Sequence, residues 1–408
     1  MDCQLAHVLD VLSGRVPVDD VRMVVPPGGE PHPRVDGKSL YGADLAHHYD
    51  TTNFSIQWSD GSIDRELAVA IGEELELSWP YFSAHGWTMP VSSDRYLLWV
   101  ILDPTVSGTG FTTVFTSDEY PAGYPVMYVN PEYEANNPGF TPDVAVHEFN
   151  HALQFAVRDW SGGAEAWYWE ASVEWGVELS RPALNWYAYS SQWYAEAPHR
   201  SVTSLTDYHQ YGMFLLNAYL AQFETGEDGM RDIWAAAGSA EWPDAIASET
   251  GIEFGELVAD MAGAVGADVL REDALYYDPV ELDDLEMPEL FGSLYIPYED
   301  ADGITFSGPV STRWAVAGEW TEDAREGPAL AVITRIGGEG VLIEVDANAI
   351  PGHGPGEDPG GGCACASGAS ERSVPLNGAI LVVIATGLGG LRRRWRLPRA
   401  PTSAVVGH

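Results

Sequence analysis

His147-Glu148-Phe149-Asn150-His151 is the stretch of this 408-residue chain from which its fold and chemistry are best approached. It lies in a run, residues 144–157, that contains no helix breaker and is apolar on both sides of the motif. Residues four apart share one face of a helix, so both imidazoles can reach one metal ion. Zinc in catalytic sites takes three protein ligands and leaves a fourth position for water. Glu148 faces an adjacent position and could accept that water's proton.

The start of this helix is predicted at Thr141-Pro142-Asp143, where a hydroxyl N-cap precedes proline at the first helical position and an acid in the first turn. The alternative to a metal site is a buried helix whose histidines only satisfy hydrogen bonds. Burying two imidazoles and a carboxylate without a partner is costly, which favours the metal site.

A candidate third ligand, Glu170, stands in a second predicted helix, residues 164–179, with eighteen residues between it and His151. The two segments together resemble the gluzincin metallopeptidases, the group that includes thermolysin and the aminopeptidase-N-like enzymes. In that group a His-Glu-x-x-His helix is followed by a turn and a second helix that supplies a Glu ligand. The resemblance implies that His147, His151 and Glu170 bind one catalytic zinc ion and that Glu148 is the general base.

Further site residues follow from the same resemblance. Glu174, one helical turn beyond Glu170, is expected to hydrogen-bond a ligand imidazole, which would fix its tautomer and raise its basicity. The alternative for Glu174 is a solvated helix face. The donor to the developing oxyanion is expected in residues 207–212, where His209 matches the position of the aminopeptidase tyrosine and Tyr211 is its rival. Either residue could instead be a packed helix residue.

The substrate is expected to be a protein or peptide. Aminopeptidase-like members carry a Gly-x-Met-Glu-Asn string that holds the free amine, and residues 101–140 contain no such string. Residues 124–130 are predicted to form an edge strand, with which an extended peptide could pair. These features favour an endopeptidase of extracellular proteins. The alternatives are a surface binding protein on the same scaffold, without turnover, and a precursor held inactive by residues 1–45. A binding protein has no need of Glu148.

The predicted fold class is α+β, with a mixed N-terminal sheet, a helical zinc-binding core and a small all-β domain. Strands are predicted at residues 53–58, 96–102, 111–115 and 124–130, and helices at 65–79, ended by Pro80, and at 205–223, with further helices to about residue 270. Later strands are predicted at 293–296, 314–320, 329–335 and 341–345, and these could form a sandwich.

The predicted domains are a lead-in or pro-segment (1–45), a β-rich subdomain (46–140), a helical zinc-binding subdomain (141–285), a β domain (286–350), a Pro/Gly linker (351–373) and a membrane or sorting segment (374–396).

The charge of the chain restricts the classes of molecule that it is expected to bind. The net charge is −41, with Lys38 as the single lysine against 61 acidic residues. Such a chain repels nucleic acid and anionic membranes, so neither is an expected ligand. The charge is expected to serve solubility, with adaptation to salty surroundings as the alternative. Three cysteines, two of them only two residues apart, exclude a disulfide framework.

The C-terminal region carries a different signal. Cys363 and Cys365 precede an apolar run, residues 374–391, and an arginine cluster at 392–396. Together they resemble the MYXO-CTERM type of bacterial sorting signal, which implies export, processing near the cysteines by sorting machinery, and retention at the cell surface. The alternative is a plain membrane anchor. Residues 1–25 lack the pattern of a signal peptide, so we expect the true start to lie upstream.

Overall fold

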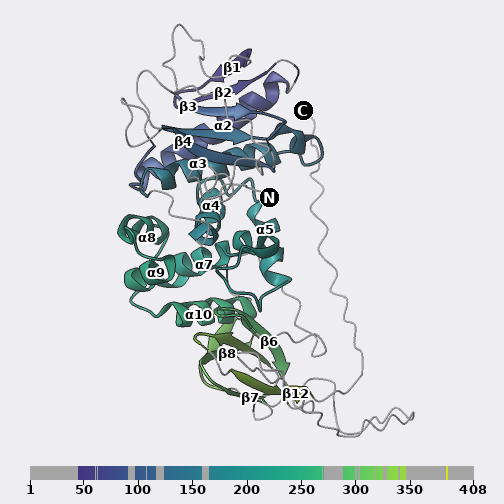
Figure 1. The fold of residues 1–408 in the computed structure, drawn as a ribbon, viewed down its shortest axis with the longest axis vertical. Helices are drawn as coiled ribbons and strands as arrows, with labels where there is room; N and C mark the ends of the chain where they lie inside the picture. Colours follow the sequence, from purple (N-terminus) through teal and green to yellow (C-terminus); the bar gives the residue numbers. More distant parts are fainter. Residues whose placement is uncertain are drawn as a thin grey trace, which may run out of the picture.

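The computed structural model describes residues 45–59, 61, 63–90, 97–106, 108–115, 124–158, 165–268, 270, 288–298, 301, 304–316, 318–324, 329–338, 341–345 and 383–384. A sheet lies at one end of the molecule, helices occupy the middle, and a second β region lies at the other end (Figure 1). This arrangement agrees with the predicted α+β class. The domain boundaries remain predictions, and Cys363, Cys365 and the arginine cluster lie outside the described residues.

The N-terminal sheet has the order β1-β2-β3-β5-β4. Its middle strands β2, β3 and β5 are parallel, and the outer strands pair antiparallel with their neighbours. The strands are β1 (His47–Asp50), β2 (Phe54–Trp58), β3 (Leu98–Leu102), β4 (Gly110–Phe115) and β5 (Tyr124–Val129). All the predicted strands of this sheet are present, and β1 was not predicted.

The prediction that residues 124–130 form an edge strand is wrong. β5 lies between β3 and β4, and the two edge strands of the described sheet are β1 and β4. Residues 125–130 are all buried, as expected for a strand that is covered on both faces and paired on both sides. Of these two edge strands, β4 is the one that pairs with β5.

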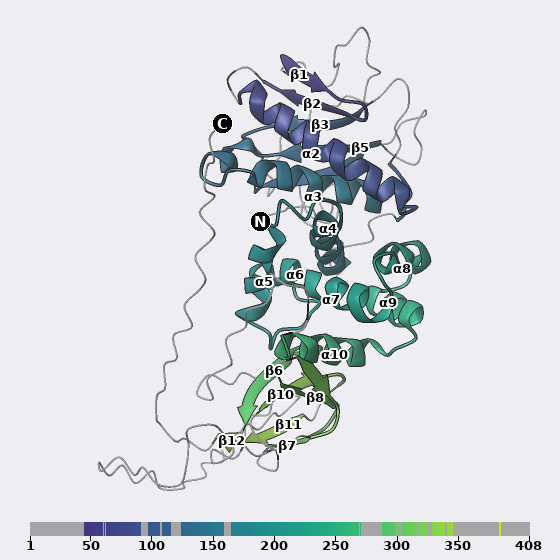
Figure 2. The same cartoon turned by 180° about the vertical axis from the view of Figure 1, so that it is seen from behind.

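Two helices, α2 (Arg65–Ala84) and α3 (Phe140–Phe155), run side by side along one face of this sheet (Figure 2). α2 does not end at Pro80 as predicted but continues to Ala84. The last turn is held by Phe82, which is fully buried and packs edge-on against Trp87 and Phe149. Burial of one aromatic side chain contributes about 1.5–3 kcal/mol, comparable with the roughly 3 kcal/mol cost of proline inside a helix.

α3 begins at Phe140, two residues before the predicted first helical position Pro142, and Thr141 is not its N-cap. Gly139 precedes the helix with a φ of 85°, a left-handed conformation that glycine adopts without strain. The carboxylate of Glu134 accepts hydrogen bonds from the backbone N–H groups of Gly139 and Thr141 at 2.6 and 2.9 Å. A carboxylate at this position also favours the positive end of the helix dipole. Glu134 therefore performs the capping role that the sequence pattern assigned to Thr141.

The middle region is helical, as predicted, but one long helix is broken. Residues 205–223 form a short turn η4 (Thr206–Tyr208), α6 (His209–Gly212), α7 (Phe214–Tyr219) and the π-helical turn η5 (Leu220–Glu224). Left-handed backbone at Asp207 and Tyr208, whose φ angles are 50° and 64°, separates η4 from α6, and Met213, with a ψ of 3°, lies between α6 and α7. The other elements are η2 (Pro131–Ala135), α4 (Ala166–Ser180), α5 (Tyr187–Ala195), α8 (Gly229–Ala237), α9 (Trp242–Thr250) and α10 (Phe254–Gly266).

The C-terminal β region contains two sheets that share a small core. One has the order β6-β10-β8-β9, from β6 (Ser293–Tyr298), β8 (Val310–Val316), β9 (Glu319–Thr321) and β10 (Ala329–Arg335). The other has the order β12-β11-β7, from β7 (Ile304–Ser307), β11 (Leu342–Val345) and β12 (Val383–Ile384). The single strand predicted at 314–320 is a hairpin, because the chain turns at Gly318 with a φ of 93°.

α10 packs on the four-stranded sheet through its glycines. A methyl group added at Gly263 would lie 2.8 Å from Trp320 Cδ1 and 2.9 Å from Arg313 Cβ, so the missing side chain permits the close approach. In the part of the chain that the structure describes, no helix has the length and apolar character that crossing a membrane requires.

Gly263→Ala tests this packing. At a helix position without close neighbours, replacing glycine by alanine stabilises the folded protein by about 0.5–1 kcal/mol. Overpacking a tight contact instead destabilises it by about 1–3 kcal/mol. We expect a net loss of about 1–2 kcal/mol in the free energy of unfolding, measured by urea titration. Gly338→Ala is the control, because a methyl group there meets nothing within 4 Å. A Gly263→Ala protein more stable than the wild type would contradict the close contact.

Candidate active site

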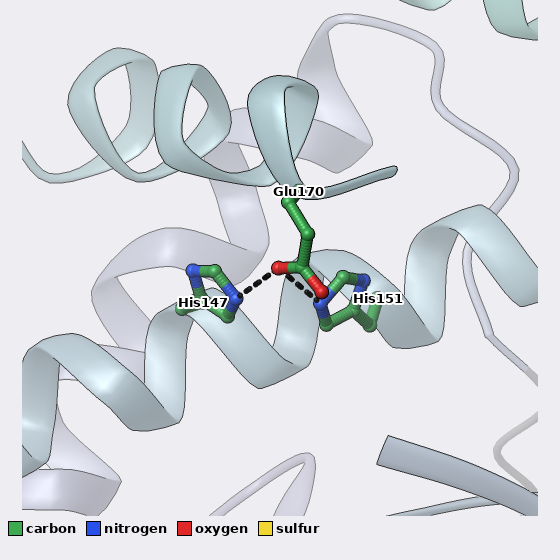
Figure 3. A group of neighbouring side chains, drawn as sticks. All are labelled: His147, His151 and Glu170. Carbon is green, nitrogen blue, oxygen red and sulfur yellow. Dashed lines mark ion pairs between the residues drawn. The ribbon is translucent and has the colours of Figure 1, made fainter. Parts of the chain in front are cut away.

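The three predicted ligands meet in the interior, between α3 and α4. His147 and His151 project from successive turns of α3, and Glu170 reaches them from α4 (Figure 3). Glu170 Oε2 lies 3.3 Å from His147 Nε2 and 3.5 Å from His151 Nε2. The helices come close because Gly176 of α4 has no side chain; a Cβ there would lie 2.1 Å from Asn150 Oδ1. The ligand atoms all lie within 4.8 Å of one another.

Glu174 lies beside His147, a contact of the kind that the gluzincin resemblance implied. Its Oε1 lies 3.2 Å from His147 Nδ1, on the side of the ring away from Glu170. Its other oxygen accepts a hydrogen bond of 3.1 Å from Ser190 of α5. Glu174 is buried and is not part of a solvated helix face. The contact leaves His147 Nε2 directed at the cluster.

His151 has a partner that the sequence reasoning missed. Its Nδ1 lies 2.7 Å from Oε1 of Gln154, which is on the same helix. The signal was available in the spacing, because residues three apart are neighbours on a helix surface. Both histidines thus have one ring nitrogen engaged by a fixed oxygen and the other directed at Glu170.

Glu148 is positioned by the edge strand β4. The hydroxyl of Thr112 lies 2.8 Å from Glu148 Oε2 and 2.8 Å from the Glu148 carbonyl oxygen. A Cβ at Gly110 would lie 2.9 Å from Glu148 Oε1 and 2.9 Å from the Tyr128 carbonyl oxygen, so glycine leaves room for the carboxylate. Neither β4 residue was predicted, because their proximity to Glu148 depends on how α3 packs on the sheet.

The electrostatics of the cluster favour a positive charge. Burial lowers the pKa of His147, but its contacts with Glu170 and Glu174 outweigh burial and raise this pKa well above its ordinary value. Burial raises the pKa of Glu170, yet His151 and His147 overcome it and lower the value to about 2. Burial raises the pKa of Glu148, and the two imidazoles only partly oppose it. The site therefore retains a proton on an imidazole unless another cation is present.

The residues fit a zinc ion. His147 Nε2 and Glu170 Oε2 are buried, and neither makes a hydrogen bond of regular geometry with any described residue. Unsatisfied polar atoms in an interior are costly, and a cation held between them would satisfy both. Two imidazole nitrogens and one carboxylate oxygen form a ligand set of catalytic zinc sites. His147, His151 and Glu170 would hold the ion.

The structure separates the two candidate oxyanion donors. The ring of Tyr211 is fully buried and lies 6.2 Å, between centroids, from the ring of His147. His209 instead contacts α5: its Nδ1 lies 3.2 Å from the Trp193 carbonyl oxygen and its ring 5.9 Å from that of Tyr194. Burial lowers the pKa of His209 to about 4, so its imidazole is neutral near pH 7.

Comparisons with known proteins give a distant likeness. No protein-family model and no curated protein matches the sequence. Among solved structures, the chain is similar to an M1 zinc metallopeptidase from Deinococcus radiodurans, with 17% identity and a TM-score of 0.30. The chain is also similar to a mutant of an M1 zinc metallopeptidase from the same organism, bound to a Tyr-Ser-Ala substrate, with 15% identity and a TM-score of 0.28. Each match covers 60% of this chain and 53% of the other, so this chain spans about half the length of those enzymes.

Replacing Glu170 tests the ligand set. Glu170→Ala removes one of three ligands, so zinc affinity should fall by at least about 100-fold, beyond the 10–100-fold effect of losing an outer partner of a ligand. The measurement is competition with a chromophoric chelator. Glu178→Ala, on the same helix, is the matched control and should bind zinc as the wild type does. Full zinc occupancy in Glu170→Ala would mean that the third ligand is misassigned.

Proposed function

We propose that this protein is a zinc-dependent peptidase. The observation that carries the proposal is the convergence of His147, His151 and Glu170 in the buried space between two helices, with Glu148 held beside them by Thr112. The spacing of these residues along the chain and their contacts in the fold agree. A zinc ion, when bound, acts as a Lewis acid and brings water to a nucleophilic state near neutral pH.

Glu148 supplies the proton transfers in this proposal. Its carboxylate accepts a proton from water and then delivers it to the leaving amine of the cleaved peptide bond. Burial raises the pKa of Glu148, which brings it nearer to the working pH of a general base. The hydrogen bond from Thr112 opposes this rise in pKa and fixes the direction of the carboxylate. The carboxylate then has fewer orientations to sample before it can accept a proton.

Tyr211 is the better candidate for the oxyanion donor. Its ring lies beside His147, and a phenol O–H can donate to charge that develops on a carbonyl oxygen. His209 is held by α5 through the Trp193 carbonyl oxygen, and we assign it a packing role.

An endopeptidase remains the preferred form of the proposal. β4 is one of the two edge strands of the described sheet, and its residues Gly110 and Thr112 lie against Glu148. An extended peptide that added to this edge would pass its backbone next to the proposed base, and strand addition places no requirement on a free terminus. Action on extracellular proteins, and processing at Cys363 and Cys365 by sorting machinery, stay predictions.

Glu148→Gln tests the peptidase proposal in the full chain. We expect zinc content to stay at the wild-type level, because Glu148 is not a ligand, while cleavage of an unfolded protein substrate falls at least about 100-fold. A chelator should abolish wild-type cleavage and added zinc should restore it. Zinc binding without cleavage in the wild type would favour a binding protein or a latent precursor. Undiminished cleavage by the variant would remove Glu148 as the base.

Tyr211→Phe and His209→Gln separate the oxyanion candidates. Loss of one oxyanion donor lowers kcat by about 100–1,000-fold, so Tyr211→Phe should show a fall of this size with KM little changed. His209→Gln should lower stability, measured by urea unfolding, and change kcat by less than about tenfold in the folded fraction. The reverse pattern would assign the donor to His209.

A further inference from the structure

Gln154 links the two helices that carry the ligands. It is fully enclosed, with 2% of its surface exposed, and its side-chain oxygen lies 2.7 Å from His151 Nδ1. Its side-chain nitrogen donates to the Trp169 carbonyl oxygen and to Ser172 Oγ of α4, each at 2.9 Å. Trp169 is the residue before Glu170. One amide therefore contacts a ligand on α3 and the backbone beside a ligand on α4.

These contacts determine which way the amide points. A backbone carbonyl oxygen can only accept a hydrogen bond, so the nitrogen of Gln154 must face Trp169. The amide oxygen then faces His151, and an oxygen of this kind can only accept. The proton of a neutral His151 must therefore be on Nδ1. Its Nε2, 3.5 Å from Glu170 Oε2, is left with a lone pair directed at the cluster.

The neutrality of this partner has a physical reason. Glu148, Glu170 and Glu174 already place three buried carboxylates around the two imidazoles. Glu174 serves His147 in the corresponding way, at 3.2 Å from its Nδ1. A second carboxylate beside His151 would add another charge to desolvate, and burying an ion costs several kcal/mol, on the order of the whole stability of a domain. An amide fixes the ring without that cost.

We infer that Gln154 is a positioning residue of the metal site: it sets the tautomer and ring orientation of His151 and joins that ligand to the segment that carries Glu170. The inference rests on the proposed function only in requiring that a metal ion binds here. Its physical basis is that outer partners of ligand histidines contribute about 10–100-fold to metal affinity.

Two substitutions separate positioning from packing. Gln154→Met retains the length of the side chain but loses both the acceptor and the donor. Gln154→Glu retains an acceptor for His151 and loses the donor to the Trp169 carbonyl oxygen. Asn150→Ala is the matched control, because Asn150 is a buried amide on the same helix whose nitrogen, among the described residues, donates only to the Val146 carbonyl oxygen of its own helix. Zinc affinity is measured by chelator competition on folded protein, and unfolding of the zinc-free protein by urea.

We expect the zinc dissociation constant of Gln154→Met to rise about 10–100-fold, while that of Gln154→Glu stays within about fivefold of the wild type. Both variants, and Asn150→Ala, should lower the stability of the zinc-free protein, and Asn150→Ala should leave zinc affinity unchanged. Equal losses of zinc affinity in Gln154→Met and Gln154→Glu, or no loss in Gln154→Met, would overturn the inference. Wild-type protein that binds no zinc would overturn both proposals, whereas zinc binding without hydrolysis would overturn the peptidase alone.

Discussion

The contact of one Glu170 oxygen with the imidazoles of His147 and His151 is the constraint on which the rest of the structure depends. It places like and unlike charges in an interior where the effective dielectric constant is low, so each charge needs a partner at short range. The closeness of α3 and α4 follows from this requirement, and Gly176 makes it sterically possible. Because acids outnumber imidazoles in the cluster, a bound cation completes the charge balance.

The N-terminal sheet supports the helices and also orients one residue of the site. It buries one side of α3, and through Thr112 and Gly110 its edge strand fixes the direction of Glu148. The two histidine ligands and the base come from one helix but are oriented by different neighbours: α4 and α5 for His147 and β4 for Glu148. A change in how α3 packs on the sheet would therefore move the base relative to the metal, even with the ligands intact.

The C-terminal β region is joined to this core by α10. Arg313 of β8 is buried and pairs with Asp260 at 2.6 Å and Glu256 at 2.9 Å, both on α10. Arg313 is buried whereas the two carboxylates are partly exposed, so loss of either acid would remove a partner from a buried guanidinium, and these contacts hold the helix on the sheet. The β region thus stabilises the last helix of the core and lies at the opposite end of the molecule from the N-terminal sheet (Figure 1).

The sequence by itself predicted that His147 and His151 share one face, because a helix places residues four apart together whatever surrounds it, and it predicted most strands through their apolar runs. Prediction from the sequence failed where the backbone conformation of a residue, or its contact partners, depend on segments far away in the chain. Pro80 is a helix stop signal and Thr141 a helix start signal, and tertiary packing overrode both. Left-handed backbone at Asp207 and Tyr208 interrupted a segment that the sequence predicts as one helix. Only the tertiary structure decided that β4 and not β5 is an edge strand, that Thr112 holds Glu148, and that Tyr211 lies beside His147 while His209 contacts α5. Such contacts join residues far apart in the chain, and local spacing carries no information about them.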